Sequence, residues 1–170
     1  MRAASGRRSR AGSALRVDSA SPAATERLGR ALGRLLGDGD LVLLSGELGA
    51  GKTRFVKGLA AGFGAARREE VVSPTFLRVE RYGAPPRLLR HVDAYRMAGG
   101  ADLESLGLSD LFGPGGATVV EWPERVVEAL PGDGLLLSFE HRGPSSRRIT
   151  LRARGPRGAA LLAALRRRAG

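Results

Sequence analysis

The sequence predicts a single α/β domain, and two observations support that prediction. First, Leu41–Ser45 is an apolar run typical of a buried strand, and it leads through a glycine-rich loop into a predicted helix over Lys52–Phe63. Second, both further strands and further helices are predicted along the rest of the chain, and a domain that combines the two packs them in layers. The length of 170 residues fits one domain with a substantial core.

The chain begins with residues 1–17, which are rich in Arg, Ser, Ala and Gly and contain no acid. This composition predicts a disordered basic tail whose removal leaves the fold intact, and an organellar transit peptide is the alternative. The domain itself is then predicted over residues 18–170. Its first helix is predicted over Pro22–Leu36, with Ser21 as the N-cap and one apolar stripe formed by Leu28, Leu32, Leu35 and Leu36.

The glycine-rich loop matches the phosphate-loop pattern G-x-x-x-x-G-K-[ST] at every fixed position. Glycines allow successive backbone N–H groups to point at phosphate oxygens, and the N-terminus of the following helix adds positive potential. Lys52 can reach the β- and γ-phosphates, and the Thr53 hydroxyl is placed to hold Mg²⁺. The loop therefore predicts a nucleotide site made by Gly46, Glu47, Leu48, Gly49, Ala50, Gly51, Lys52 and Thr53.

The remaining elements follow from short apolar runs and from Gly and Pro signals. Strands are predicted over Phe76–Tyr82, Arg87–Val92, Ala117–Glu121, Gly134–Glu140 and Arg148–Arg154, the last two as an antiparallel pair. Helices are predicted within Met97–Leu106, after Pro123 with Val126, Val127 and Leu130 on one face, and over Gly158–Arg168, a basic C-terminal helix over about residues 158–168.

Two carboxylates complete the predicted site. Asp93 and Glu121 are each the first acid after an apolar strand, and strand ends meet at the carboxyl edge of an open α/β sheet. Phosphoryl transfer needs a metal held on the far side of the phosphates and a positioned water or acceptor. The residues alone leave open which acid serves the metal. Arg96 either neutralises phosphoryl charge or pairs with a surface acid, and Trp122 either packs in the core or reports nucleotide binding.

Composition excludes several other classes of site. The chain has no cysteine, which excludes disulfides and thiolate metal sites, and its two histidines argue against a zinc centre. The longest apolar runs are too short to span a bilayer, so we expect a soluble, cytoplasmic protein without a membrane partner.

The net charge of +11 is concentrated at the two ends of the chain. Residues 1–17 hold five arginines and residues 147–170 hold eight, whereas residues 18–146 have 17 acids against 15 basic residues, a formal charge of −2. Basic ends favour a polyanionic partner.

Six short motifs stand in order from about Ser21 to Leu130. They are Thr25-x-x-Leu28-Gly29, Gly46–Thr53, Ser73-Pro-Thr-Phe76, His91-x-Asp93-x-Tyr95-Arg96, Leu103-Glu104-x-x-Gly107 and Val120-Glu-Trp122. Together they resemble one family, the bacterial tRNA threonylcarbamoyladenosine biosynthesis ATPases called TsaE (formerly YjeE). Glu47 stands where many relatives carry Asp, and Arg54 where a second Thr is common.

The resemblance implies a single P-loop NTPase domain with a central mixed sheet flanked by helices. It implies an ATPase that uses ATP and Mg²⁺ and is weak alone. Its partners would be TsaD- and TsaB-like proteins, with tRNA reached through that complex, which the ATPase resets between turnovers. By matching position, Thr53 and Glu121 would hold Mg²⁺, Asp93 would support hydrolysis, Thr25 would lie near the adenine, and residues 73–76 would form a switch-like loop.

Two other functions remain open from the sequence. A small-molecule kinase shares the phosphate loop, although no arginine-rich lid insert or acceptor-binding segment is evident. A basic RNA-binding protein in which nucleotide hydrolysis is incidental would explain the arginine-rich ends.

Overall fold

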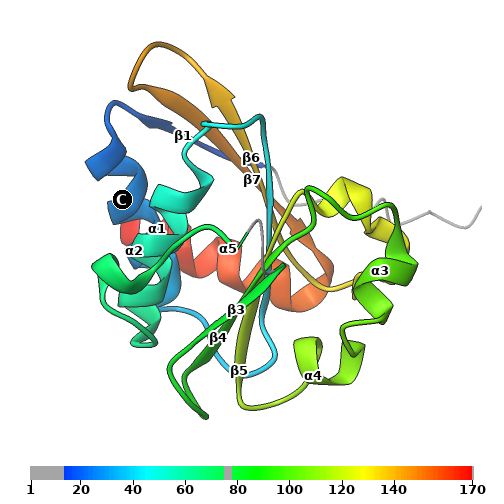
Figure 1. Cartoon of the computed structure of the whole chain (residues 1–170). Helices are drawn as coiled ribbons and strands as arrows, with labels where there is room; N and C mark the ends of the chain where they lie inside the picture. Colours follow the sequence, from blue (N-terminus) through cyan, green and yellow to red (C-terminus); the bar gives the residue numbers. More distant parts are fainter. Residues whose placement is uncertain (1–13, 75–77, 170) are drawn as a thin grey trace, which may run out of the picture.

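The computed structural model describes residues 14–74 and 78–169 and is built on a mixed seven-stranded sheet (Figure 1). The strand order is β1-β7-β6-β2-β5-β4-β3. Strands β6, β2, β5 and β4 run parallel to one another, whereas β7, β1 and β3 pair antiparallel with their neighbours. The strands are β1 (Leu15–Ser19), β2 (Leu41–Ser45), β3 (Val79–Tyr82), β4 (Leu88–Asp93), β5 (Gly116–Glu121), β6 (Gly134–His141) and β7 (Arg147–Arg154).

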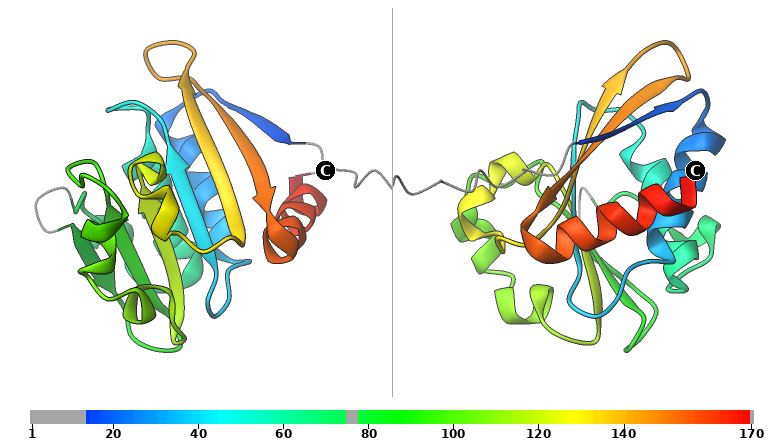
Figure 2. Two further views of the ribbon diagram at one scale, coloured as in Figure 1. Left: turned by 90° about the vertical axis from the view of Figure 1, so that its right-hand side faces the viewer. Right: turned by 180° about the vertical axis from the view of Figure 1, so that it is seen from behind.

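Helices cover both faces of the sheet, which confirms the predicted fold class (Figure 2). One face packs against α1 (Pro22–Gly33), α2 (Lys52–Phe63) and α5 (Gly155–Ala169). The other packs against α3 (Gly100–Glu104), α4 (Leu108–Phe112) and two 3₁₀ helices, η2 (Pro123–Arg125) and η3 (Val127–Ala129). A third 3₁₀ helix, η1 (Arg68–Glu70), follows α2 on the surface.

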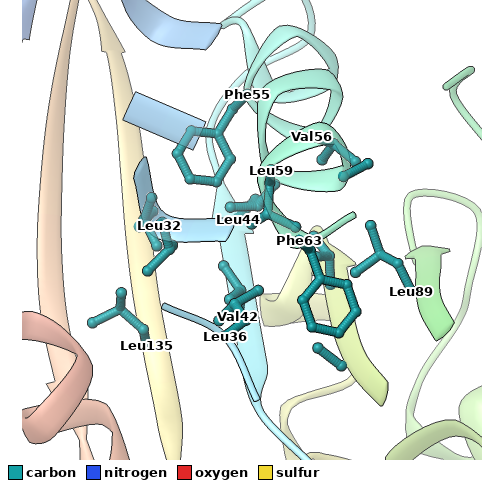
Figure 3. Packing of buried hydrophobic residues seen from close by; sticks show 14 of the residues in the cluster. Leu32, Leu36, Val42, Leu44, Phe55, Val56, Leu59, Phe63, Leu89 and Leu135 are labelled. Atoms are coloured by element: carbon teal, nitrogen blue, oxygen red, sulfur yellow. The ribbon is translucent and has the colours of Figure 1, made fainter. Parts of the chain in front are cut away.

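The larger part of the core lies between the sheet and the helices α1, α2 and α5, and Figure 3 shows its part around β2 and α2. The phosphate loop is therefore anchored at both ends, because the strand before it and the helix after it are both buried. The most deeply buried side chains include Leu32 from α1, Val42 and Leu44 from β2, and Phe55, Val56 and Leu59 from α2.

Helices α1 and α2 touch along their backbones, because glycines of each helix face the backbone of the other. A Cβ atom added to Gly29 would lie 2.1 Å from the carbonyl oxygen of Phe55, and one added to Gly58 would lie 1.9 Å from that of Glu26. Neither distance leaves room for a side chain. This contact holds the N-terminal turn of α1 beside the phosphate loop.

The predicted boundary of the basic tail is wrong at its C-terminal end. Leu15–Ser19 forms strand β1, which pairs with β7, and Leu15 and Val17 pack against the core. The pairing was not evident from the sequence because the strand is short and its partner lies far along the chain. Residues 1–13 lie outside the described residues.

Other predicted elements differ in extent. The first helix ends at Gly33 and continues as tight turns, with Leu36 N–H bonded to the Gly33 carbonyl oxygen. The segment after Pro123 forms two 3₁₀ turns and not one helix, and Val127 points outward with 58% of its surface exposed. Helix α4 was not predicted, and α3 occupies only the middle of Met97–Leu106. The described part of the chain contains no helix long and apolar enough to cross a membrane.

Deleting residues 1–19 should destabilise the protein, because it removes the packing of Leu15 and Val17 and leaves the edge of β7 unpaired. A loss of about 2 kcal/mol of apolar burial corresponds to a decrease in Tm of about 4–8 °C. Circular dichroism melting measures this change. Deletion of residues 1–13, which leaves β1 in place, is the matched control, and an equal Tm for both truncations would contradict the role given to β1.

Candidate nucleotide-binding site

The phosphate loop connects β2 to α2 through a sharply curled backbone. Gly49 and Gly51 adopt left-handed conformations, with φ values of 74° and 101°, and Gly51 caps α2. Such values favour glycine, which explains its presence at both positions. Arg147 of β7 braces the loop from outside, since its guanidinium donates to the carbonyl oxygens of Ala50 at 3.0 Å and Gly49 at 3.1 Å. Nothing in the local sequence pointed to Arg147.

Lys52 begins α2, and its side chain turns back over the loop. The ammonium donates to the carbonyl oxygen of Gly46 and lies 3.9 Å from the ring centroid of Trp122, within cation–π range. Burial lowers the pKa of Lys52, and the carboxylates of Glu121, Glu124 and Asp93 oppose that shift. The lysine is thus a partly desolvated cation facing a group of acids.

Trp122 reaches this position because its backbone is left-handed, with a φ of 57°. The backbone N–H of Trp122 donates to the carbonyl oxygen of Leu44 at 3.1 Å, which fixes the turn after β5 against the end of β2. The indole also contacts Tyr95, with 4.9 Å between ring centroids. A non-glycine residue in this conformation stores strain of the kind found at functional sites.

The two predicted carboxylates lie side by side. Asp93 ends β4 and Glu121 ends β5, the two residues are paired in the sheet register, and each is only 4% exposed. The Asp93 carboxylate accepts a hydrogen bond from the Tyr95 N–H at 2.9 Å. The prediction that both acids reach the same edge of the sheet is confirmed.

His91 holds Glu121 in place, a contact that the sequence analysis did not identify. The side chain is fully buried, and its Nε2 lies 2.7 Å from Oε1 of Glu121. His91 and Asp93 are two residues apart on β4, so they share one face of the sheet. The two-residue spacing was the only sign in the sequence that His91 lies on the same face as the site. Its contact with Glu121 could not be predicted, because it depends on the register of β4 against β5.

The phosphate loop, both acids and Trp122 line one cavity of about 260 Å³. Ser73 also borders it, whereas Thr75 and Phe76 of the predicted switch-like loop lie outside the described residues. Arg96 is exposed and is not among the lining residues. The lining residues that were predicted for this site are Leu48, Gly49, Ala50, Gly51, Lys52, Thr53, Asp93, Glu121 and Trp122.

Thr25 lines a second cavity of about 220 Å³ that also borders the phosphate loop, together with Arg54 and Arg147. The Thr25 hydroxyl lies 2.8 Å from that of Ser19, which fixes its orientation. Of the other predicted residues, Gly46 contributes its carbonyl oxygen to Lys52, and Glu47 is exposed and lines neither cavity.

The residues present fit a magnesium ion that is shared with phosphates. Thr53 and Glu121 offer a hydroxyl and a carboxylate to the same cavity, and Mg²⁺ characteristically takes one or two protein oxygens, with phosphates and water as its remaining ligands. Among the described residues, no cluster of three or more His, Cys, Asp or Glu side chains could hold a metal alone.

Comparison with known proteins decides the family. Residues 19–149 match the model of the family described as threonylcarbamoyl adenosine biosynthesis protein TsaE. The chain belongs to the TsaE family.

Curated TsaE relatives support this assignment. The protein named tRNA threonylcarbamoyladenosine biosynthesis protein TsaE from Treponema pallidum is 41% identical over 81% of this chain and 99% of its own length. Its namesake from Bacillus subtilis is 37% identical over 81% of this chain and 84% of its own. The crystal structure of Bacillus subtilis YdiB superposes with a TM-score of 0.77 at 31% identity, covering 93% of this chain and 97% of the other.

Titration with ADP should change the fluorescence of Trp122, the only tryptophan of the chain. Phosphate would compete for the Lys52 ammonium and draw it away from the indole, which it now contacts at 3.9 Å. Emission spectra measure the response. Lys52→Ala should abolish it, while Lys57→Ala, the only other lysine, should preserve it. A normal response in Lys52→Ala would contradict the coupling between the two side chains.

Proposed function

We propose that this chain is the ATP-binding and ATP-hydrolysing subunit of the complex that makes threonylcarbamoyladenosine in tRNA. The observation that carries the proposal is the convergence of Lys52, Thr53, Asp93 and Glu121 on one cavity in a chain that belongs to the TsaE family. A P-loop small-molecule kinase, the alternative from sequence, is less well supported, because the family match extends beyond the phosphate loop to residues 19–149.

In this proposal the phosphate loop binds ATP through its backbone amides, and Lys52 balances the charge that develops on the γ-phosphate. Thr53 and Glu121 would hold Mg²⁺, which supplies charge neutralisation to the phosphates when bound. Thr25 would lie beside the adenine, in the neighbouring cavity. Glu121 keeps its orientation because His91 bonds one of its oxygens.

Asp93 is proposed to position the attacking water. The backbone N–H of Tyr95 donates to the Asp93 carboxylate at 2.9 Å and orients it. The backbone N–H of Asp93 donates to the Arg78 carbonyl oxygen at 2.9 Å. A buried carboxylate held in this way can accept a hydrogen bond from a water molecule, so that the lone pair of the water oxygen points at the phosphorus.

Hydrolysis is proposed to be weak alone and to act within a cytoplasmic complex with TsaD- and TsaB-like proteins. The ATPase would reset that complex between turnovers, and tRNA would be reached through it. Reconstitution with TsaD- and TsaB-like proteins and tRNA tests this function. ATP hydrolysis that the partner proteins do not stimulate would overturn it.

Lys52→Ala should reduce partner-stimulated hydrolysis by about 100-fold or more, because a preorganised charge at the transferred phosphoryl is lost. Phosphate release measured with the partner proteins tests this, and Lys57→Ala is the matched control. An unchanged rate in Lys52→Ala would refute the assignment of the phosphate loop.

Glu121 and Asp93 should have different roles. Glu121→Ala should raise the Mg²⁺ concentration needed for half-maximal activity, because a metal ligand is lost. Asp93→Ala should lower kcat while the affinity for nucleotide largely survives. Magnesium titrations and mant-ADP binding separate the two effects, with the exposed Glu69→Ala as control. The reverse pattern would show that the two roles are exchanged.

A further inference from the structure

A cavity of about 570 Å³ lies beside the nucleotide site and is not used by the proposed reaction. Its walls come from the first turns of α1, the start of α2 and the 3₁₀ helix η1. Four arginines face it: Arg27 and Arg30 from α1, Arg54 from α2 and Arg68 from η1. We call it the arginine cavity.

The charge of the arginine cavity is not balanced by the described residues. Arg68 pairs with Glu26 at 2.6 Å, and this glutamate is the only acid in the lining. Arg27, Arg30 and Arg54 are exposed and have no ion-pair partner within residues 14–74 and 78–169. Three uncompensated guanidinium groups around one hollow attract a polyanion.

The lining favours phosphate groups over an acidic protein surface. It contains no aromatic side chain, whereas protein interfaces are anchored by buried aromatic residues together with arginine. Guanidinium groups bind phosphate oxygens in a bidentate manner. The basic stripe on α1 also continues past the cavity to Arg34, which is exposed one turn beyond Arg30. An extended row of cations fits a chain of phosphates better than a single one.

Arg54 connects this cavity with ATP binding, because it borders the arginine cavity, the phosphate-loop cavity and the cavity lined by Thr25. We propose that the arginine cavity binds the phosphodiester backbone of an RNA strand beside the nucleotide. This proposal rests on the proposed function for its choice of RNA, and it adds a direct RNA contact made by this subunit. Since binding linkage is reciprocal, nucleotide and RNA should alter each other's affinity through Arg54.

Fluorescence anisotropy with a fluorescein-labelled anticodon stem-loop RNA tests the proposal on the full chain. The double variant Arg27→Ala/Arg30→Ala should bind this RNA about tenfold more weakly, and the slope of log K against log salt should become shallower by about 1.5 to 2. Arg27→Lys/Arg30→Lys should recover most of the affinity. The matched control is Arg152→Ala/Arg167→Ala, which removes two exposed arginines from β7 and α5.

Equal loss of RNA affinity in the double variant and the control, or no loss in either, would overturn the proposal, because general charge and not the cavity would then explain binding. Unchanged mant-ADP affinity and Tm in the double variant would exclude damage to the fold.

If the double variant instead keeps its RNA affinity but loses stimulation by the partner proteins, the cavity docks a protein and the proposal fails. If wild-type hydrolysis is never stimulated while RNA binding still depends on Arg27 and Arg30, the proposed function fails and the RNA site stands.

Discussion

The backbone contact between α1 and α2 is the constraint that positions the two cavities lined by α1, which are the arginine cavity and the cavity lined by Thr25. It requires glycine at Gly29 and Gly58, where any Cβ would collide with a carbonyl group of the other helix. Because α2 also begins at the phosphate loop, the contact places the first turns of α1 against that loop. Gly29 and Gly58 therefore position Thr25 and the arginines of α1, although neither glycine has a side chain that could bind or react.

The acids of the site are arranged by the sheet. Parallel pairing of β4 with β5 sets Asp93 beside Glu121, and the same register brings His91 within hydrogen-bond distance of Glu121. Burial would raise the free energy of two ionised carboxylates in isolation. Lys52 and His91 supply donors to this edge, so the acids, the lysine and the histidine form one electrostatic unit. Removing one member changes the environment of the others.

Local signals in the sequence predicted the parts of the molecule that local physics determines. The strand Leu41–Ser45 and the helix Lys52–Phe63 have the predicted bounds, because the glycines and the apolar run mark both ends. Helix α4 was missed because it has only five residues between Gly107 and Gly113. The segment after Pro123 was misread as one helix, since the left-handed backbone at Trp122 starts a tight turn there. Arg147 contacts the phosphate loop from β7, and the arginine cavity is lined by α1, α2 and η1. Neither could be predicted from local sequence, because these segments meet only in the folded chain.

The order of the strands has a consequence for how the protein folds. Strand β2, which carries the phosphate loop, has both its neighbours far along the chain: Leu44 pairs with Glu121 of β5, and Ser45 with Ser138 of β6. Such non-local pairing is slow to form, because a large loop must close before the contacts stabilise it. The cavity that holds Lys52 and Glu121 is complete only after this closure. A nucleotide bound there would add about 2.7 kcal/mol of stability at 100 times its Kd, and this energy would stabilise the closed sheet as a whole and not the loop alone.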